Sequence, residues 1–277
     1  MRFPLFFYLL LMSCRSPHTI EIKGSDTEVN VASRLAEDFY KTNATFNISI
    51  SGGGSGLGIA SLMNGEADIA NSSRPMTTEE TALLKKRKIE CDTFAFAEDA
   101  VAFVVSATFP VDSLTIDQLA NILSGKFKNW SSVTGTQLPI NVYGRQSNSG
   151  TYEFVKGKLN ISYTKQAKEM NGNAQIIEGI KVDKSGIGYV GAGYVMNKDA
   201  ADGLGVKVLK IASLEGTKAI SPLDERAIAE RKYFFQRPLY QFIRRESVKK
   251  VKPLIDFEQS PRGLAVIKAS GYYSVPK

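Results

Sequence analysis

Apolar positions follow two different periods along this chain, and stretches of the two kinds alternate. Half-exposed strands are predicted where apolar and polar side chains alternate, at residues 20–23, 46–50 and 138–143. An amphipathic helix is predicted between the first two strands by the spacing i, i+3, i+4 and i+7 of Ala32, Leu35, Ala36 and Phe39. Because strands and helices keep alternating in this way, the pattern predicts an α/β fold.

The later part of the chain continues the same alternation. The run 100–105 is almost entirely apolar, which is typical of a strand buried on both faces. Residues 115–118 have the spacing of a helix capping box, and a last helix is predicted from Ser260-Pro261 to Gly271. Further strands are predicted at 186–191 and 233–240. Pro253 lies within an apolar helical spacing, so that helix should kink or begin late.

Four polar turns follow predicted strands, at residues 24–27, 52–56, 71–74 and 145–151. Their candidate binding residues are Ser25, Asp26, Thr27, Ser55, Ser73, Arg74, Arg145, Ser149, Gly150 and Thr151. Hydroxyl groups, arginine and the free N–H groups of a helix start all donate hydrogen bonds to anions. In α/β folds ligands bind outside the carboxyl ends of strands. Together the four turns predict one anion held by many donors.

Each turn also has a simpler interpretation. Residues 145–151 taken alone can be a Ser/Gly-rich surface turn, and Asp26 or Thr27 can serve only as a helix cap. The glycine-rich loop 52–58 is not followed by a Lys-Ser or Lys-Thr pair, so it is not a P-loop. Its glycine spacing does not fit a dinucleotide fingerprint either.

Composition restricts the chemistry further. The net charge is +7, from 35 basic and 28 acidic residues among 277, which is too diffuse to indicate nucleic acid. The single histidine, His18, precedes the first predicted strand. This excludes histidine triads and histidine metal sites from the folded part. We expect a binding protein without catalytic residues, cofactor or metal.

The amino terminus has the features of an export signal. One basic residue precedes an apolar run from Phe3 to Met12, too short to span a bilayer. Leu11-Met12-Ser13-Cys14 resembles a bacterial lipobox, so we expect residues 1–13 to be a signal peptide, Cys14 to carry lipid, and 14–19 to be a tether. Cys91 would then have no disulfide partner.

These motifs resemble a known family, the phosphate-binding proteins (PstS) of bacterial phosphate ABC transporters. The resemblance rests on Gly24-Ser25-Asp26-Thr27, Gly54-Ser55-Gly56, the run 67–74, the segment 114–130 and Arg145-x-x-x-Ser149-Gly150-Thr151. It implies a two-lobed periplasmic binding protein of type II, each lobe a mixed sheet flanked by helices, with phosphate in the cleft between them. Lobe 1 would comprise 20–105 and 234–277, lobe 2 would comprise 106–233, and 104–107 and 233–236 would cross between them.

The resemblance also implies partners and ligand residues. Phosphate would be delivered to the permease subunits of an ABC transporter by a monomer anchored through lipid at the periplasmic face of the membrane or in the cell envelope. Ser25, Thr27 and Ser55 would bind phosphate from lobe 1, and Arg145, Ser149, Gly150 and Thr151 from lobe 2.

One residue departs from the family pattern. Many members have an aspartate that accepts the proton of hydrogen phosphate where this chain has Ser73, followed by Arg74. Asp26 is our candidate for that acceptor, and Arg74 can bind ligand or pair with Asp26 or Asp68. The departure keeps open a protein for another tetrahedral oxyanion, such as sulfate or molybdate. The sequence also leaves open a phosphate-sensing lipoprotein without a transport role, and an enzyme acting on phosphate esters.

The acceptor hypothesis is tested by Asp26→Asn. Sulfate carries no proton at neutral pH and would leave a carboxylate acceptor unpaired, which costs roughly 1–3 kcal/mol. We expect the substitution to lower the preference for phosphate over sulfate by about tenfold or more in competition binding. An unchanged preference would show that Asp26 is not the acceptor.

Overall fold

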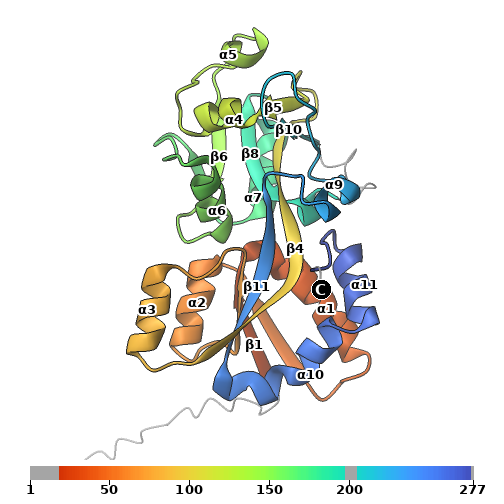
Figure 1. Ribbon diagram of the computed structural model, residues 1–277. Helices are drawn as coiled ribbons and strands as arrows, with labels where there is room; N and C mark the ends of the chain where they lie inside the picture. Colours follow the sequence, from red (N-terminus) through yellow and green to blue (C-terminus); the bar gives the residue numbers. More distant parts are fainter. Residues whose placement is uncertain (1–18, 197–204, 276–277) are drawn as a thin grey trace, which may run out of the picture.

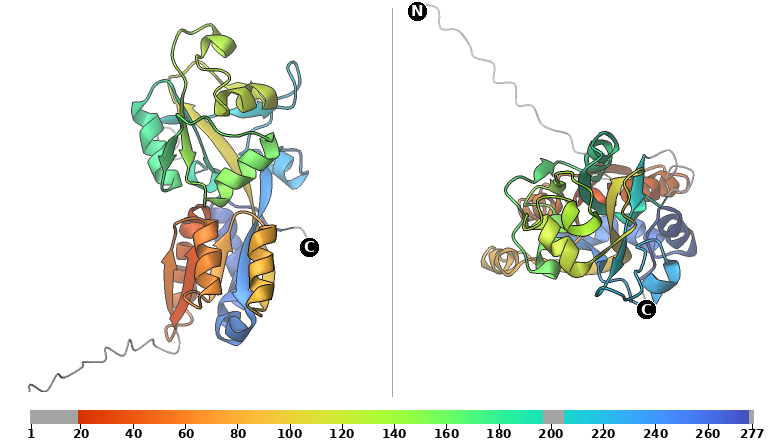
Figure 2. Two further views of the ribbon diagram at one scale, coloured as in Figure 1. Left: turned by 90° about the vertical axis from the view of Figure 1, so that its left-hand side faces the viewer. Right: turned by 90° about the horizontal axis from the view of Figure 1, so that it is seen from above.

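The computed structural model describes residues 19–196 and 205–275, which form two lobes. The lobes lie one above the other, and two long strands, β4 (Cys91–Ser106) and β11 (Gln236–Arg244), run side by side from one lobe into the other (Figure 1). The two further views show the same division (Figure 2). The predicted α/β class is confirmed.

Lobe 1 is built on a mixed sheet in the order β2-β1-β3-β11-β4. β1, β2 and β3 are parallel, and β11 runs antiparallel to both β3 and β4. Its other elements are β1 (Thr19–Gly24), η1 (Asp26–Glu28), α1 (Val29–Tyr40), β2 (Asn47–Ser51), α2 (Ser55–Met63), β3 (Ile69–Ser72), α3 (Thr78–Lys86), η3 (Arg245–Ser247), α10 (Val248–Glu258) and α11 (Pro261–Ala269).

Alternating side chains of β11 pack on opposite faces of this sheet. Phe242 joins Ile59 and Leu62 beneath α2 and α3. Ile243 packs with Leu254 on the other face, under α1, α10 and α11. The period of two along the strand therefore gives lobe 1 a helix layer on each side of the sheet.

Lobe 2 continues the sheet from β4 in the order β4-β8-β6-β7, with β9 also paired to β4. A separate small sheet joins β5 and β10. The elements are β5 (Ser113–Thr115), α4 (Ile116–Leu123), α5 (Ser131–Thr134), β6 (Asn141–Arg145), α6 (Gly150–Leu159), β7 (Lys168–Met170), α7 (Asn173–Val182), β8 (Gly186–Gly191), η2 (Ala192–Tyr194), β9 (Val206–Val208), β10 (Lys210–Ala212) and α9 (Glu225–Ala229).

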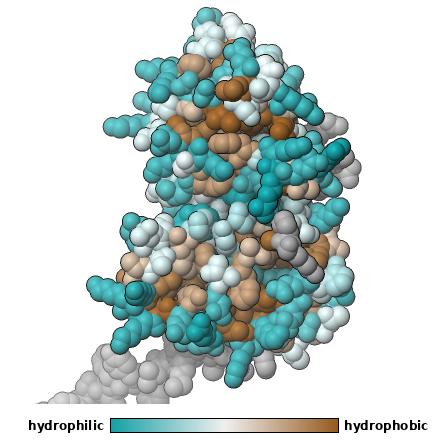
Figure 3. All heavy atoms as spheres, in the orientation of Figure 1, coloured by the Kyte–Doolittle hydropathy of each residue, from teal (hydrophilic) through white to brown (hydrophobic). Residues whose placement is uncertain are grey.

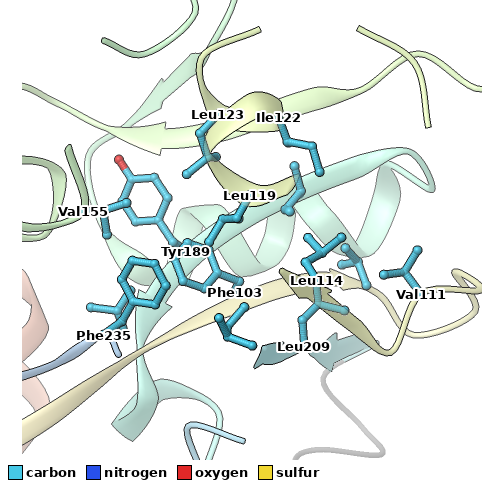
Figure 4. Close-up of a cluster of buried hydrophobic side chains, with 14 of the residues drawn as sticks. Phe103, Val111, Leu114, Leu119, Ile122, Leu123, Val155, Tyr189, Leu209 and Phe235 are labelled. Carbon is cyan, nitrogen blue, oxygen red and sulfur yellow. The ribbon is translucent and has the colours of Figure 1, made fainter. Parts of the chain in front are cut away.

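The core of lobe 2 explains the apolar run that sequence analysis predicted to be a buried strand. Phe103 packs against Tyr189 and Phe235, with ring centroids 6.3 and 4.8 Å away, on the side of the sheet where α4 lies (Figure 4). Ala102 and Val104 point to the opposite face and pack against α7. Both faces of this stretch are buried, which confirms the prediction.

The register of β4 shows where the chain passes between lobes. Residues up to Ala100 pair with β11, and Val101 to Val105 pair with β8 of lobe 2. Tyr233 donates from its hydroxyl to the carbonyl of Val101, 2.7 Å away, so it also belongs to lobe 2. We therefore propose that the crossing points lie near Ala100 and Gln236.

Local predictions hold at several element ends, but β11 begins at Gln236 and ends at Arg244, later than the strand predicted at 233–240. The capping box at Thr115 and Gln118 forms both of its hydrogen bonds, at 2.9 and 3.1 Å. The helix containing Pro253 does not begin late, which was one of the two expectations for it. α10 begins at Val248, five residues before the proline. The sixth residue of a helix still loses a backbone donor when it is proline, and the packing of Val251, Leu254 and Ile255 offsets that loss.

The export signal, Cys14, the tether up to His18 and the lone histidine itself lie outside the described residues. Cys91 is half-buried and free. Within 19–196 and 205–275, no helix is both long and apolar enough to cross a bilayer. Hydrophilic side chains surround the outline of both lobes on the face drawn in Figure 3, with hydrophobic side chains showing between them.

Candidate functional site

Helix starts from both lobes meet at the seam between them. α2 begins at Ser55 in lobe 1, and α6 begins at Gly150 in lobe 2. The first turn of lobe 1, at Asp26–Glu28, leads into α1 at the same place. N–H groups at a helix start lack intrahelical partners and carry the positive end of the helix dipole. The seam thus gathers anion-binding backbone from three directions.

Hydroxyl groups fill the centre of this seam. Thr27 Oγ1 of lobe 1 lies 3.1 Å from Thr151 Oγ1 of lobe 2, and both residues are buried. Ser55 Oγ accepts a hydrogen bond from the backbone N–H of Ser73 at 3.1 Å. A Cβ on Gly150 would lie 2.3 Å from Ser55 Oγ and 2.6 Å from Ser73 Oγ. Only glycine allows the two lobes to approach this closely.

Arg145 supplies a cation from lobe 2. It is the last residue of β6, and only 3% of its side chain is exposed. Its Nη2 donates to the carbonyl of Asn171 at 3.1 Å, while Nε and Nη1 are buried without a hydrogen-bond partner. Burial lowers the pKa of this guanidinium, and the nearby Asp26 carboxylate opposes that shift. An arginine with unused donors is a ready partner for an anion.

Arg237 is a second cation at the seam, and sequence analysis missed it. It lies on β11, where the strand passes between lobes, and its Nη2 donates to Thr151 Oγ1 at 3.0 Å. Nε and Nη2 bind Asp99 Oδ2 at 3.1 and 2.8 Å. Burial raises the pKa of Asp99, and the charge of Arg237 opposes the increase. The guanidinium also stands over the ring of Phe154, 5.2 Å from its centroid.

Asp26 connects the lobes from the edge of the seam. Its Oδ2 accepts from the backbone N–H and the side-chain Nδ2 of Asn173, at 2.8 and 2.7 Å. Arg145 Nη1 is 3.5 Å from the same oxygen, and Tyr194 donates to the Asp26 carbonyl at 2.7 Å. Asn173, Arg145 and Tyr194 all belong to lobe 2. The carboxylate therefore holds the two lobes together in this arrangement.

The remaining predicted residues take supporting positions. Ser149 caps α6, accepting from the N–H of Tyr152 at 3.4 Å. The side chain of Ser25 lies beside the buried carboxyl of Glu28, inside lobe 1. Asn148 makes a further contact across the seam, where its carbonyl accepts from the N–H of Gly56 at 3.0 Å.

Arg74 pairs with a carboxylate, one of the two roles that the sequence left open, but the two partners that we named for it are wrong. Its guanidinium binds both carboxylate oxygens of Glu80 at 2.7 Å, and neither Asp26 nor Asp68. Asp68 instead pairs with Lys250, whose Nζ is 2.6 Å from Oδ2. Glu80 also completes the capping box of α3, so Arg74 braces the turn that carries Ser73.

The arrangement is suited to binding an anion. Hydroxyls, backbone N–H groups and two guanidinium groups converge on the seam from both lobes. In the part of the chain that the structure describes, no group of three or more His, Cys, Asp or Glu side chains is placed to hold a metal.

A specific signal could have identified Arg237. It is the one charged residue in the run Tyr233–Leu239, which is otherwise aromatic, apolar or amide-bearing. A charge inside a strand of this kind needs a buried partner. The partner, Asp99, lies 138 residues earlier in the chain, and pattern analysis gives no means of pairing the two.

Known proteins resemble this chain over most of its length. The PBP superfamily domain family matches residues 15–262. The phosphate-binding protein PstS of Staphylococcus aureus (strain USA300) is 32% identical over 262 residues, covering 92% of this chain and 77% of that protein. Protein SphX of Synechococcus elongatus is 30% identical over 244 residues, covering 84% and 71%. A crystal structure from Clostridium perfringens, described as a phosphate ABC transporter substrate-binding protein with bound phosphate, superimposes with a TM-score of 0.81 at 25% identity, covering 93% and 100%.

The buried pair of Arg237 and Asp99 gives a stability prediction. Arg237→Met leaves Asp99 buried without its cation, and we expect the free energy of unfolding to fall by about 3–5 kcal/mol in urea titrations. The double variant Arg237→Met/Asp99→Leu should regain most of that loss. Arg245→Met is the control, because its side chain and that of its partner Glu90 are 62 and 66% exposed, and it should cost less than about 1 kcal/mol. An equally small loss for Arg237→Met would contradict the prediction.

Proposed function

We propose that this chain, which belongs to the PBP superfamily and within it to the PstS phosphate-binding proteins, binds inorganic phosphate and delivers it to an ABC permease. Its fold is that of a two-lobed type II binding protein. The relatives named for phosphate binding cover nearly the whole chain, so the proposal concerns both lobes of the chain.

One observation carries the proposal: donors from both lobes converge where α2 and α6 begin. Thr27 and Ser55 come from lobe 1, and Gly150 and Thr151 from lobe 2, within contact distance of one another. A tetrahedral oxyanion presents acceptors in several directions at once, and a seam between two bodies can offer it donors from several sides.

The site residues would act in three ways. Arg145 offers full charge through Nε and Nη1, which have no hydrogen-bond partner within the protein. Ser55, Ser73, Thr27 and Thr151 offer hydroxyls, and the starts of α2 and α6 offer N–H groups. Arg237 would position Thr151 through its 3.0 Å hydrogen bond and add charge from behind. Closure would exclude water and so strengthen each hydrogen bond.

Asp26 would have two roles in this scheme. Its contacts with Asn173 and Arg145 favour a role in holding the closed form. The proton of hydrogen phosphate would be accepted by the same carboxylate. The two roles are separable, since loss of closure weakens phosphate and sulfate binding equally, whereas loss of a proton acceptor changes their ratio.

The location follows from the export signal. Lipid on Cys14 would anchor a monomer at the periplasmic face of the membrane or in the cell envelope, with residues 14–19 as the tether. Permease subunits would then meet the two lobes at the membrane surface.

A second candidate ligand class is another tetrahedral oxyanion, sulfate or molybdate. The observation that favours it is Ser73, which lies at the centre of the seam beside Gly150 and brings a hydroxyl instead of a carboxylate. Without an acceptor there, selection against sulfate depends on Asp26 alone.

Equilibrium binding of radiolabelled phosphate to the chain from Ser16 onward tests the function, with sulfate and molybdate as competitors. We expect saturable binding of phosphate that a large excess of sulfate leaves in place. Displacement by sulfate or molybdate would support the second ligand class. No binding of any of the three would overturn both.

Gly150→Ala tests the seam itself. The added methyl group would lie against Ser55 Oγ and Ser73 Oγ, so the lobes could not reach this arrangement. We expect phosphate affinity to fall by about 100-fold or more, which corresponds to about 2.7 kcal/mol, with little change in thermal stability.

Gly157→Ala is the matched control on the same helix. No atom lies within 4 Å of a Cβ at this position, and alanine favours the helix by about 0.5–1 kcal/mol. Affinity should therefore be unchanged and stability equal or higher. Normal phosphate binding by Gly150→Ala would contradict the proposed position of the site.

A further inference from the structure

A group of polar side chains is buried in lobe 1, away from the seam. Glu28, Asn71, Gln241 and Glu258, which we call the buried polar cluster, are 0, 3, 2 and 3% exposed. They lie on the face of the lobe 1 sheet that packs against α1, α10 and α11. That face is otherwise lined by residues such as Ile22 and Leu254.

Each member of the cluster occupies a position that the local pattern makes apolar. Gln241 lies between Leu239 and Ile243 on the inward face of β11. Glu258 continues the stripe of α10 formed by Val251, Leu254 and Ile255. Glu28 precedes Val31 and Leu35 by three and seven residues, and Asn71 follows Ile69 by two. Four elements thus break their pattern at one place, which is typical of functional positions.

The fold brings these four residues together. Asn71 and Gln241 are directly opposite each other in the pairing of β3 with β11. Gln241 donates from Nε2 to Glu258 Oε1 at 3.2 Å. Glu28 is close enough to Glu258 for the charge of that carboxylate to contribute to its raised pKa.

The cluster is rich in acceptors that have no donor. Five of its oxygens are buried and make no hydrogen bond of standard geometry, namely both carboxylate oxygens of Glu28, Asn71 Oδ1, Gln241 Oε1 and Glu258 Oε2, although the Ser25 side chain lies beside Glu28. The nearby cation Arg237 binds Asp99, Thr151 and the carbonyl of Ser73. Leaving such groups unpaired is costly in a protein interior, because they have lost their hydration.

A cavity of about 490 Å³ adjoins two members of the cluster. Gln241 and Glu258 line it together with Phe94, Phe96, Ile255 and Leu264. A solute in this cavity therefore lies against two members of the cluster, whose unpartnered oxygens are themselves buried.

We propose that the buried polar cluster binds a hard cation, which the cavity admits. Carboxylate and amide oxygens are the ligands that Na⁺, K⁺ and Ca²⁺ prefer, and one ion can satisfy several oxygens at once. The site is separate from the phosphate seam, and the proposal does not depend on phosphate binding.

Protonation alone is a poorer solution for the cluster. Burial raises the pKa of Glu258 to about 7 and the pKa of Glu28 well above its ordinary value. Two protons supply two donors, which is fewer than the oxygens that need partners. Asp99 and Arg237 also face Glu28, and they neutralise each other. A cation is the partner that matches the number of free oxygens.

Thermal unfolding in different salts tests the proposal. The chain from Ser16 onward is heated at pH 8 without phosphate, in NaCl, KCl, NH₄Cl, CaCl₂ or MgCl₂, each compared with tetramethylammonium chloride at equal ionic strength. We expect at least one of the small cations to raise Tm by about 3 °C or more at saturation. The cation that raises Tm identifies the kind of ion that the cluster binds.

Two variants assign the effect to this site. Glu258→Gln removes one charge with little change in shape and should abolish the cation-dependent rise in Tm. Asp256→Asn is the control on the same helix, because its side chain is 58% exposed, and it should keep the rise. If Glu258→Gln does not fold, Glu28→Met/Glu258→Leu replaces the two carboxylates of the cluster with apolar groups and should fold without responding to cations.

Equal Tm values in all the salts would overturn the proposal and leave protonation as the explanation of the cluster. A rise that survives Glu258→Gln or the apolar double variant would place the cation elsewhere and would also overturn it.

Discussion

Donors that converge on a water-poor seam must find an acceptor when the lobes meet, and much of this structure follows from that requirement. Three helix starts, the hydroxyls of Thr27 and Thr151, and the guanidinium groups of Arg145 and Arg237 all face it. Two carboxylates of the protein pair with some of these donors. Asp99 lies behind the seam, and Asp26 lies at its edge. The donors that these leave unmatched define the anion that the site would hold.

The two crossing strands make this arrangement possible. β4 pairs with β11 in lobe 1 and with β8 in lobe 2, so one continuous backbone belongs to both sheets. The pair of Arg237 and Asp99 lies where the two strands pass from one lobe to the other, and it contacts Thr151 of lobe 2. Backbone pairing of these strands determines which ends of the lobes face each other. The side chains at the crossing determine which groups of the two lobes come into contact.

Local sequence was sufficient to predict many of the elements and most donors, because caps, glycine-rich loops and apolar spacing act over a few residues. The capping box at Thr115, the strand 186–191 and the start of α11 at Ser260-Pro261 are examples. Partners distant in sequence were not predictable, because no local pattern pairs Arg237 with Asp99 or Asp26 with Asn173. The buried polar cluster was not predictable for the same reason, since the local pattern shows a polar residue at each apolar position but not that the four residues meet.

The return of β11, α10 and α11 to lobe 1 affects the order in which this protein can fold. Lobe 2 is one continuous stretch of chain, whereas the central strand of lobe 1 is made from residues near the carboxyl end. β3 has no partner on one side until β11 has been synthesised, and its exposed edge is a template for wrong pairing meanwhile. Lobe 2 can therefore fold first, and the lobe that carries Ser55 and Thr27 is completed last. A chain cut short before residue 236 would present half of the seam on a folded body and the other half on an open sheet.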